Sequence, residues 1–581
     1  MIALETDNST QNQSIPKHWD VAPPIPDYVN QELREFSPFM RQLLFNRGLT
    51  SAQAARAFIE GKSPYDTNPL LIKDMQKAVD ILHSAIENQV KIAIYGDYDA
   101  DGVTSSALMF EFLSALGSQP RVYIPNRFDE GYGLNLDAID QLASEGIQLV
   151  ITVDCGVRSV KEVQRANELG MQTIITDHHL PSDPLPPAQA VINPRQDGDI
   201  YPEKHLAGVG LAYKLAQAYL QTYTQPNLSA DRWLDLVAIG TIADLAPLIG
   251  ENRELVKAGL NQIRRTERQG LFSLAQVAGI NLDKINAGNI GFNIGPRLNA
   301  AGRIDSALSA FDLLVTKDIF TAGILAQKLE AQNTQRQNIM NEIQDAAIAM
   351  SYADEPDQPI IFAASPEFNE GVIGLAASRV TEAFYRPAII GHQDETHTVA
   401  SCRSINEFNI TEALDQCAEL LVRYGGHSAA AGLTVRNENL TELIARLRAL
   451  AAETFKGLAL TPELFIDREI QLDKLEGKHI PMILDDLHYL EPTGRNNPEA
   501  IFCSRKCQTR NVRTVGADGK HLKLRILSGS RDFDAIAFRH GHWLDKLPKY
   551  IDIAYTFELN EYMGQSSLQL NIKDIKPTQE G

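Results

Sequence analysis

The feature that most restricts how this chain can fold is a short apolar run that ends in a cluster of acidic residues. The run, Ile92 to Tyr95, is typical of a buried strand, and after Gly102 the chain is expected to turn into an apolar helix, opened by Thr104 and ending near Leu116. Between them stand three carboxylates at alternate positions, Asp97, Asp99 and Asp101. A loop at the carboxyl end of a parallel strand is where an α/β sheet places its ligand. Carboxylates crowded there repel one another unless a cation lies among them, which favours a divalent metal site over an ordinary acidic turn.

Two further strands end in the same kind of side chain. Leu149–Val153 and Thr173–Thr176 are both typical of short buried strands, and a helical pattern, Val160–Leu169, lies between them. This alternation predicts a parallel sheet, in which the carboxyl ends of the strands meet at one edge. Oxygen and imidazole ligands gathered at that edge would suit Mn²⁺ or Mg²⁺. The residues that follow the two strands are Asp154 and, after the second, Asp177, His178 and His179.

Several stretches resemble the motifs of the DHH phosphoesterase superfamily. Asp244 stands at the end of a predicted helix, Asp231–Leu245, and would by itself be an ordinary solvated helix end. Its importance comes from the motif that contains it. The matching stretches, in chain order, are GDYDADG from Gly96, VDCG from Val153, DHH from Asp177 and GTIADLAPL from Gly240. Two more, GPRLNAAGRID from Gly295 and GGHSAAAG from Gly425, are similar to the superfamily branch of single-strand-DNA exonucleases that carries a DHHA1 domain.

This resemblance, which covers residues 75 to 575, implies a site of two divalent cations, Mn²⁺ or Mg²⁺. The implied metal ligands are Asp99, Asp101, Asp154, His178 and Asp244. Asp97 and His179 are implied as close companions, each a second-metal ligand, a base or a group that stabilises the transition state. The residues implied to contact substrate are Arg127, Arg303, Ser401, Arg403, Gly425, Gly426 and His427. Each arginine in this set could instead be an ordinary surface residue, and Arg127 stands in a loop that could be a plain turn.

The expected fold is α/β, with an all-β domain at the end. From Phe465 onward the pattern changes to short alternating strands, with turns such as Ala517–Gly519 and a basic strand that carries Lys520, Lys523 and Arg525. Such a barrel is typical of an OB-fold, which binds single strands by stacking and phosphate contacts. The predicted domains are a polar lead-in (1–75), a parallel-sheet DHH catalytic domain (76–310), a connecting helix (311–355), a smaller α/β DHHA1 domain (356–460) and an OB-like barrel (461–581).

Two places depart from the pattern of the branch. Asn369 and Glu370 stand where its members commonly have a histidine, within a glycine turn that precedes a helix. Glu491–Pro498 replaces the usual Pro-Phe-Gly-x-Gly-Asn-Pro, so that Thr493 takes the place of an aromatic side chain. The resemblance therefore predicts that one stacking platform for a base is missing.

Composition excludes some classes of protein and leaves others open. Of the 581 residues 44% are hydrophobic and 22% charged, and no apolar run approaches the ~18–20 residues that span a bilayer. The first twenty residues, to Asp20, contain no signal-like apolar core, and five scattered cysteines indicate a reducing compartment, so a cytoplasmic protein without a membrane segment is expected. The net charge of −20 argues only weakly against a nucleic-acid partner, because binding depends on local patches.

The leading functional hypothesis is a metal-dependent exonuclease that degrades single-stranded DNA 5′→3′ to mononucleotides in DNA repair and recombination. Direction and DNA preference are implied by the resemblance alone, as are a helicase and a single-strand-binding protein as partners. A relative that cleaves very short oligonucleotides or cyclic dinucleotides remains an alternative, although such relatives generally lack the terminal barrel. A non-catalytic replication scaffold is the third possibility. Such a protein would be expected to have lost metal-binding residues, whereas every implied metal ligand is present in this sequence.

Overall fold

The computed structural model describes residues 15–127, 130–131, 133–354, 358–477, 479–516, 519–562 and 565–578. The first part of the predicted lead-in, residues 1–14, and the start of the predicted turn, Ala517 and Asp518, lie outside the described residues. The chain forms two compact units. The first unit comprises Gln53–Asn338 and Leu490–Pro498, and the second comprises Met1–Ala52, Ile339–Tyr489 and Glu499–Gly581.

The first unit is built on a parallel sheet with the strand order β3-β2-β4-β5-β6. The register pairs Gly96 with Val153, Val153 with Thr176, and Thr176 with Ile192, so the carboxyl ends of four strands are level. The residues that follow these strands therefore start from one edge. The strands are β2 (Ile92–Gly96), β3 (Arg121–Tyr123), β4 (Leu149–Val153), β5 (Gln172–Thr176) and β6 (Ala190–Ile192).

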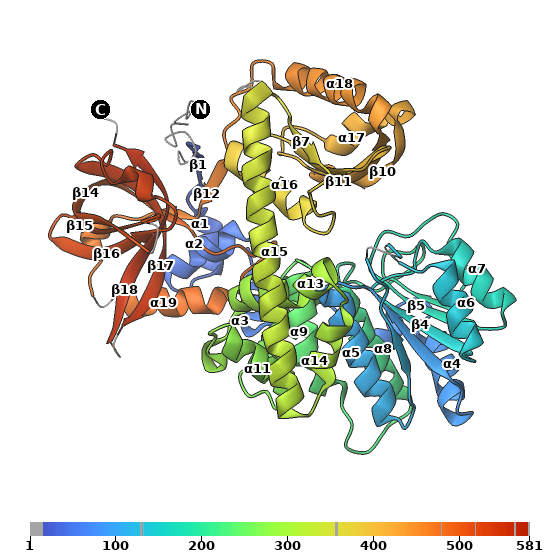
Figure 1. The fold of residues 1–581 in the computed structure, drawn as a ribbon. Helices are drawn as coiled ribbons and strands as arrows, with labels where there is room; N and C mark the ends of the chain where they lie inside the picture. Colours follow the sequence, from blue (N-terminus) through green and yellow to red (C-terminus); the bar gives the residue numbers. More distant parts are fainter. Residues whose placement is uncertain are drawn as a thin grey trace. The chain divides into compact units, whose positions relative to one another are not determined.

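Helices cover both faces of this sheet (Figure 1). Alternate residues of β2 illustrate the division, because Ile92 and Ile94 belong to one buried cluster and Ala93 and Tyr95 to another. Burial on both faces explains why β2 and β4 are apolar at nearly every position instead of at alternate ones. On the first face lie α4 (Met75–Glu87), α5 (Ala100–Ala115) and α8 (Gly208–Thr222), and on the second lie α6 (Leu136–Ser144) and α7 (Val160–Glu168).

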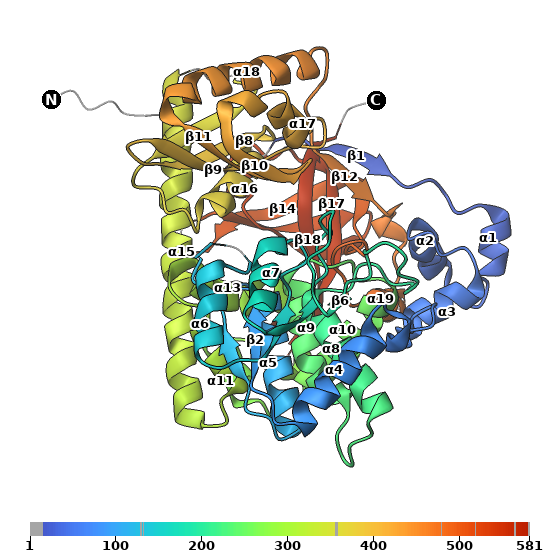
Figure 2. The same cartoon turned by 90° about the vertical axis from the view of Figure 1, so that its right-hand side faces the viewer.

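A helical layer extends the first cluster away from the sheet. The connecting helix predicted over residues 311–355 is in fact two helices, because the chain breaks at Thr316 and restarts where Asp318 accepts a hydrogen bond from Thr321 N at 2.7 Å. The second of these, α15, is one continuous helix in both views (Figures 1 and 2). The helices of this layer are α3 (Ala52–Glu60), α9 (Leu234–Ala243), α10 (Gly250–Ile263), α11 (Gln269–Val277), α12 (Ala287–Asn289), α13 (Gly295–Ile304), α14 (Leu308–Val315) and α15 (Ile319–Asp354).

The second unit contains a mixed sheet with the order β10-β11-β9-β8-β7, in which β7 and β8 are parallel and the other pairs antiparallel. The pattern of residues 400–404 predicts a turn at a strand end, but Ser401 lies inside β9 and pairs with Ile390 and Gly432. The elements here are β7 (Ile361–Ser365), α16 (Ile373–Phe384), β8 (Ala388–Gln393), β9 (His397–Arg403), α17 (Ile410–Asp415), β10 (Leu421–His427), β11 (Ala430–Arg436) and α18 (Asn437–Phe455).

The second unit also contains the predicted barrel, which the pairing of β14 with β17 closes. Its basic strand is largely neutralised, because Lys523 lies 2.7 Å from Asp534 and Arg525 lies 2.8 Å from Asp532 on the neighbouring strand. The barrel strands are β13 (Arg468–Glu469), β14 (Phe502–Val515), β15 (His521–Ser528), β16 (Arg531–Ala537), β17 (Tyr550–Tyr562) and β18 (Gln565–Pro577).

Short N-terminal elements complete the second unit. The strand β1 (His18–Val21) pairs in parallel with β12 (Glu463–Ile466), and Trp19 Nε1 donates to Asp574 Oδ2 of β18 at 2.6 Å. The remaining helices are α1 (Asp27–Glu32), α2 (Pro38–Asn46) and α19 (His479–Leu490). Within the described residues, no helix combines the length and the apolar character needed to cross a membrane.

Candidate metal centre

The carboxyl edge of the parallel sheet in the first unit carries the acidic cluster. The chain passes from β2 to β3 on one side and later to β4 on the other, so the topological switch point lies between β2 and β4. Open α/β sheets bind their ligands at this point. The residues after β2, β4 and β5 and at the end of α9 all meet there, in three overlapping groups whose possible ligand atoms lie within 4.8 Å of one another. These groups contain Asp97, Asp99, Asp101, Asp154, His178, His179 and Asp244, which is every residue predicted for the metal centre.

The loop after β2 turns directly into α5, earlier than predicted. Asp99 caps the helix, because its Oδ1 accepts hydrogen bonds from Asp101 N at 2.9 Å and Gly102 N at 3.1 Å. Gly102 therefore lies in the first turn of α5 and not in a turn before it. A Cβ atom at this position would stand 2.5 Å from the carbonyl oxygen of Asp97, so glycine allows the helix to approach the loop closely.

The motif that contains Arg303 supports the same loop from α13. Asn299 Oδ1 accepts a hydrogen bond from Ala100 N at 2.7 Å. Gly302 packs so tightly that an added Cβ would lie 2.5 Å from the carbonyl oxygen of Tyr98. These contacts of Asn299 and Gly302 hold the acidic loop in place. The sequence alone did not indicate this role for either residue.

Asp101 is fully buried and points at the start of α8. Its two oxygens accept hydrogen bonds from Gly208 N at 2.7 Å and Val209 N at 2.8 Å. The amino end of a helix favours a negative charge. Burial nevertheless raises the pKa of Asp101 to about 7, and the charge of Asp99 acts in the same direction. Asp101 therefore ionises readily only if positive charge is supplied nearby.

His178 stands in the middle of the cluster, between three carboxylates. Its Nε2 lies 3.1 Å from Asp154 Oδ1 and 4.0 Å from Asp101 Oδ2, and its Nδ1 lies 3.9 Å from Asp244 Oδ2. Burial lowers the pKa of His178 to about 3, and its neighbour His179 adds to this effect. The imidazole is therefore neutral at physiological pH, which is the form that binds a metal ion.

Three buried polar atoms in the cluster have no hydrogen-bond partner. They are Asp97 Oδ1, Asp154 Oδ1 and His178 Nε2, of which the last two lie 3.1 Å apart but are not aligned for a hydrogen bond. A buried oxygen or nitrogen without a partner is costly, and in native proteins such an atom requires an explanation such as an ion. A set of carboxylates with one neutral imidazole is the donor set that suits Mn²⁺ or Mg²⁺. The residues present therefore fit the predicted divalent cations.

The other carboxylates of the cluster also resist ionisation. Burial raises the pKa of Asp97 and of Asp154 well above the ordinary value, and the charges of neighbouring carboxylates raise both further. Burial raises the pKa of Asp244 to about 8, again with help from its neighbours. Mutual repulsion of this kind is relieved when a cation lies among the carboxylates.

Asp177 was recognised in the sequence as a residue that follows a strand, but no role was predicted for it. Its Oδ1 lies 2.7 Å from His179 Nδ1 and accepts a hydrogen bond from His179 N at 3.0 Å, while its Oδ2 accepts one from Val157 N at 2.9 Å. Burial acts to raise the pKa of Asp177, but the hydrogen bonds from His179 outweigh it and keep that pKa below its usual value. Burial acts to lower the pKa of His179, but Asp177 outweighs it and raises that pKa. Asp177 thus fixes the ring of His179 and favours its charged form.

Two of the predicted substrate-binding arginines lie beside the acidic loop. Arg127 stacks 5.0 Å over the ring of Tyr98. Arg303, in the last turn of α13, is close enough to Asp99, Arg127 and Arg336 for their charges to act on it, and burial lowers its pKa to about 10. Arg336 of α15 belongs to the same group, because its charge acts on Arg303. We refer to Arg127, Arg303 and Arg336 as the Tyr98-side arginines.

The remaining predicted contacts belong to the second unit. Ser401 and Arg403 meet at the start of α16, where an added Cβ on Gly374 would lie 3.2 Å from both side chains. Arg403 also donates to Ser378 Oγ at 3.1 Å. Gly425, Gly426 and His427 form the end of β10, paired with β11, and His427 is exposed.

Asn369 and Glu370, which replace a family histidine, have partners within the second unit. Asn369 Oδ1 accepts a hydrogen bond from Gly371 N at 2.9 Å, and Glu370 lies 3.9 Å from His392.

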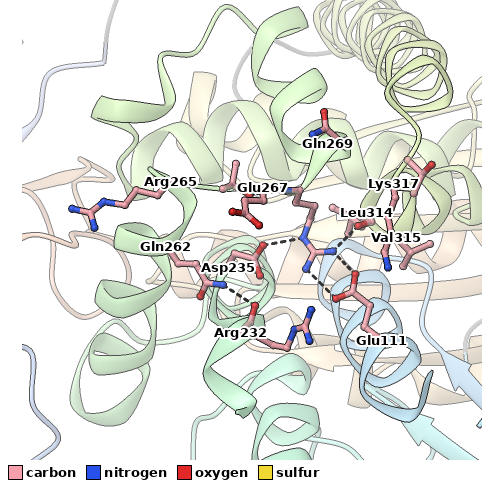
Figure 3. Close-up of a pocket in the computed structure, with 13 residues that line it drawn as sticks. Glu111, Arg232, Asp235, Gln262, Arg265, Glu267, Gln269, Leu314, Val315 and Lys317 are labelled. Atoms are coloured by element: carbon pink, nitrogen blue, oxygen red, sulfur yellow. Dashed lines mark hydrogen bonds and ion pairs between the residues drawn. The ribbon is translucent and has the colours of Figure 1, made fainter. Parts of the chain in front are cut away.

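A separate cavity of about 500 Å³ lies at the far ends of α5 and α9, where Glu111 and Asp235 line it (Figure 3). Each stands about nine residues from the metal centre along its helix, or roughly 14 Å. Arg268, on the cavity wall, is paired with Glu111 at 2.6 Å and Asp235 at 2.9 Å and donates to Leu314 O at 2.6 Å. The charge of Arg268 is neutralised by these two carboxylates. We therefore interpret the ion pairs on the cavity wall as structural, and the cavity as separate from the metal centre.

Comparison with known proteins identifies the family. The model of the DHH family, N-terminal domain, matches residues 91–241, the DHHA1 domain matches 357–453, and the RecJ OB domain matches 466–574. The single-stranded-DNA-specific exonuclease RecJ of Bacillus subtilis is 38% identical over 562 residues, which cover 96% of this chain and 70% of that protein. The chain belongs to the RecJ family. The Escherichia coli RecJ is 35% identical over 570 residues, covering 94% of this chain and 96% of its own.

A solved RecJ structure has the same overall fold. The crystal structure of RecJ in complex with Mn²⁺ from Thermus thermophilus superposes with a TM-score of 0.82 at 29% identity, covering 97% of this chain and 80% of that one. A second structure of that RecJ, in complex with Mg²⁺, superposes with a TM-score of 0.77 at 28% identity and covers 97% and 79%. The fold class predicted from the sequence, a DHH domain with a DHHA1 domain and an OB barrel, is thereby confirmed.

Proposed function

We propose that this protein is a metal-dependent exonuclease that degrades single-stranded DNA in the 5′→3′ direction to mononucleotides. The observation that carries the proposal is the buried cluster of carboxylates and imidazole, with three unpartnered ligand atoms, in a chain of the RecJ family. Curated relatives are named single-stranded-DNA-specific exonucleases, and their activity is assigned here to this chain.

Two divalent cations are assigned to the ligands Asp97, Asp99, Asp101, Asp154, His178 and Asp244. When bound, such cations supply Lewis-acid activation of a phosphodiester and of water. The chain itself contributes the arrangement of the ligands. Asp99 holds the loop by capping α5, and Asp101 is aimed by the amino end of α8. His178, neutral because it is buried, can donate a ring nitrogen without first losing a proton.

His179 is assigned to the substrate and not to a metal. Asp177 accepts its Nδ1–H and raises its pKa, so the ring can carry a positive charge near neutral pH. A protonated imidazole next to the cations can donate to an oxygen of the scissile phosphate, where negative charge increases in the transition state. Of the three roles that the sequence left open for His179, which were metal ligand, base and stabilisation of the transition state, we therefore propose the last.

The Tyr98-side arginines are assigned to the 5′-terminal phosphate. Arginine suits this role because its planar fork binds two phosphate oxygens at once. Ser401, Arg403 and the glycine-rich end of β10 are assigned to the same strand from the DHHA1 domain. Glycine without a side chain lets the backbone approach a ligand closely.

Several features support the proposed substrate, the catalytic activity and the cellular location. The RecJ OB match at 466–574 favours a long single strand over a short oligonucleotide or cyclic dinucleotide, and the complete ligand set disfavours a non-catalytic scaffold. Five buried, unpaired cysteines fit a reducing compartment, so we place the protein in the cytoplasm. A helicase and a single-strand-binding protein are the proposed partners, and repair and recombination the proposed setting.

The test is digestion of single-stranded DNA labelled at either end, with Mn²⁺ or with a chelator. Mononucleotides should be released from the 5′ end only when Mn²⁺ is present. Asp101→Asn should remove this activity, because it takes away the charge of a ligand. The side chain keeps its shape but loses one of the two hydrogen bonds from Gly208 N and Val209 N, so circular dichroism is used to check that the variant is folded. Digestion without any divalent cation, or full activity of the variant, would refute the proposal.

A further inference from the structure

The segment Leu490–Pro498 belongs to the first unit, although the residues on both sides of it belong to the second. Arg253 of α10, which is 1% exposed, holds this segment. Its guanidinium donates to the carbonyl oxygens of Leu490 at 3.0 Å, Glu491 at 2.7 Å and Pro492 at 3.0 Å, and it stacks 3.8 Å over the ring of Phe58. A buried charge is tolerated only when its donors are paired, so these contacts make a firm anchor.

The anchored segment places Arg495 beside the metal centre. Asn497 Nδ2 closes the loop by donating to Leu490 O and Pro492 O, both at 2.8 Å. Leu248 N donates to Arg495 O at 2.9 Å, so the backbone of Arg495 is fixed. Its side chain is exposed, and Nη1 lies 3.4 Å from the carbonyl oxygen of Leu245, the residue that directly follows Asp244. Thr493, which replaces a family aromatic residue, belongs to the same anchored segment and therefore to the first unit.

A second arginine, Arg195, borders the same side of the centre. Its Nη2 lies 3.1 Å from His205 Nδ1, and its Nε donates to Lys204 O at 3.1 Å. Its backbone N donates to Asn193 Oδ1 at 2.8 Å, and Asn193 in turn donates to His179 O at 2.8 Å. This chain of contacts fixes the loop after β6 to the DHH motif.

The electrostatic effects of the two arginines agree with this placement. The charge of Arg195 acts on His178, and the charge of Arg495 acts on Asp244. Both charges act on His205, whose pKa is lowered mainly by burial and further by these two arginines. Of the Tyr98-side arginines, Arg127 acts instead on Asp97, and Arg303 interacts with Asp99. The two sets of arginines therefore interact with different parts of the acidic cluster.

We propose that Arg195 and Arg495 together bind a backbone phosphate of the substrate strand on the His178–Asp244 side of the metal centre. The proposal rests on the proposed function, because it requires a polynucleotide substrate. Each guanidinium makes only part of its possible hydrogen bonds within the fold, and the contact of Arg495 with Leu245 O is long enough to be exchanged for a phosphate oxygen. In a chain of net charge −20, a strand needs such local cations to approach an acidic centre.

The experiment compares two substrates in the wild type and in Arg495→Gln and Arg195→Gln. One substrate is a 5′-phosphorylated single-stranded DNA oligonucleotide, and the other is p-nitrophenyl thymidine 5′-phosphate, a single diester with no neighbouring phosphate. Each variant should raise KM for the oligonucleotide roughly tenfold, as expected for a lost charge-assisted contact, with kcat nearly unchanged. The single diester should be cleaved as by the wild type, because it cannot reach the proposed subsite.

Two further measurements separate a phosphate contact from a structural effect. The slope of log affinity against log salt concentration should become shallower by about 0.7 for one lost phosphate contact on a single strand. A neutral methylphosphonate, moved along the oligonucleotide one linkage at a time, should weaken binding to the wild type at one position that Arg495→Gln no longer distinguishes. Arg195→Lys should restore part of the affinity, since the charge is kept and only the fork is lost.

The matched control is Arg265→Gln. Arg265 is an exposed arginine of the same unit that lines the separate cavity at the far ends of α5 and α9, so the same change of charge there should leave every readout unchanged. If Arg495→Gln and Arg195→Gln match this control on the oligonucleotide, or impair the single diester equally, the subsite is refuted. A wild-type enzyme that cleaves neither substrate would instead refute the proposed function.

Discussion

Without divalent cations, the stability of the first unit should fall as the pH rises from about 4 to about 8. The pKa of Asp101 is raised from 3.8 to about 7 and that of Asp244 to about 8, in both cases chiefly by burial. A proton that the folded state binds and the unfolded state does not bind stabilises the folded state. This contribution is complete below the unfolded pKa and is lost as the pH rises through the folded pKa.

The size of the effect follows from Asp101 alone. A change of its pKa from 3.8 to about 7 corresponds to roughly 4 kcal/mol between the two ends of the pH range. The first unit is larger than 250 residues, so one kcal/mol shifts its melting temperature by somewhat less than about 2 °C, and a loss of roughly 7 °C is expected. The coupled carboxylates share protons, so their separate effects do not add.

Thermal unfolding, measured in a chelator and in Mn²⁺ across this pH range, tests the reasoning. Bound Mn²⁺ requires ionised ligands, so the increase in melting temperature that it produces should grow with pH. Asp101→Asn should flatten the pH dependence in chelator, because an amide stays neutral throughout, and should reduce the effect of Mn²⁺. A melting temperature in chelator that rises over this range, or a Mn²⁺ effect that is larger at the acidic end, would show that the carboxylates are not held as described.

Three other changes test separate parts of the site. Asp177→Asn should lower the alkaline limit of the pH–rate profile, because His179 loses the partner that raises its pKa, while Mn²⁺ affinity measured by calorimetry stays near normal. Gly208→Ala would place a methyl group 2.6 Å from Cβ of the ligand Asp154 and should weaken Mn²⁺ binding roughly 10- to 100-fold, whereas Gly323→Ala, with nothing within 4 Å, should not. Arg303→Gln should lose most of the preference for 5′-phosphorylated over 5′-hydroxyl ends, and an unchanged ratio of kcat/KM for the two ends would remove Arg303 from the end-binding group.

The sheet edge could be predicted because its sequence signal is local. β2, β4 and β5 are almost entirely buried and rich in apolar and β-branched residues, and the end of each is followed by an aspartate. The parallel arrangement then places the following residues together without further information. Asp244 has no such signal, because the end of an apolar helix before Pro247 looks the same whether its carboxylate is solvated or buried. Only the motif resemblance assigned it to the cluster.

The start of α5 was predicted wrongly for a physical reason. Glycine after an acidic run is typical of a turn. In the structure Asp99 is both a helix cap and a member of the acidic cluster, so the helix begins within that cluster, and Gly102 is needed for close packing against Asp97. One side chain with two roles cannot be recognised from spacing alone.

The placement of Arg495 could not be predicted from sequence, because it depends on a contact between residues far apart in the chain. In α10, Arg253 stands among charged and apolar neighbours as it would on an ordinary amphipathic helix, and nothing in the pattern indicates that it is 1% exposed. Its three bonds are to backbone carbonyls, which any sequence offers, so residues 490–498 carry no matching side-chain signal. The family pattern Pro-Phe-Gly-x-Gly-Asn-Pro also allows any residue at position 495, because the contact with Leu248 uses only the backbone of Arg495. The location of Arg495 beside Asp244 is therefore set by backbone contacts between distant parts of the chain and not by the identity of its own side chain.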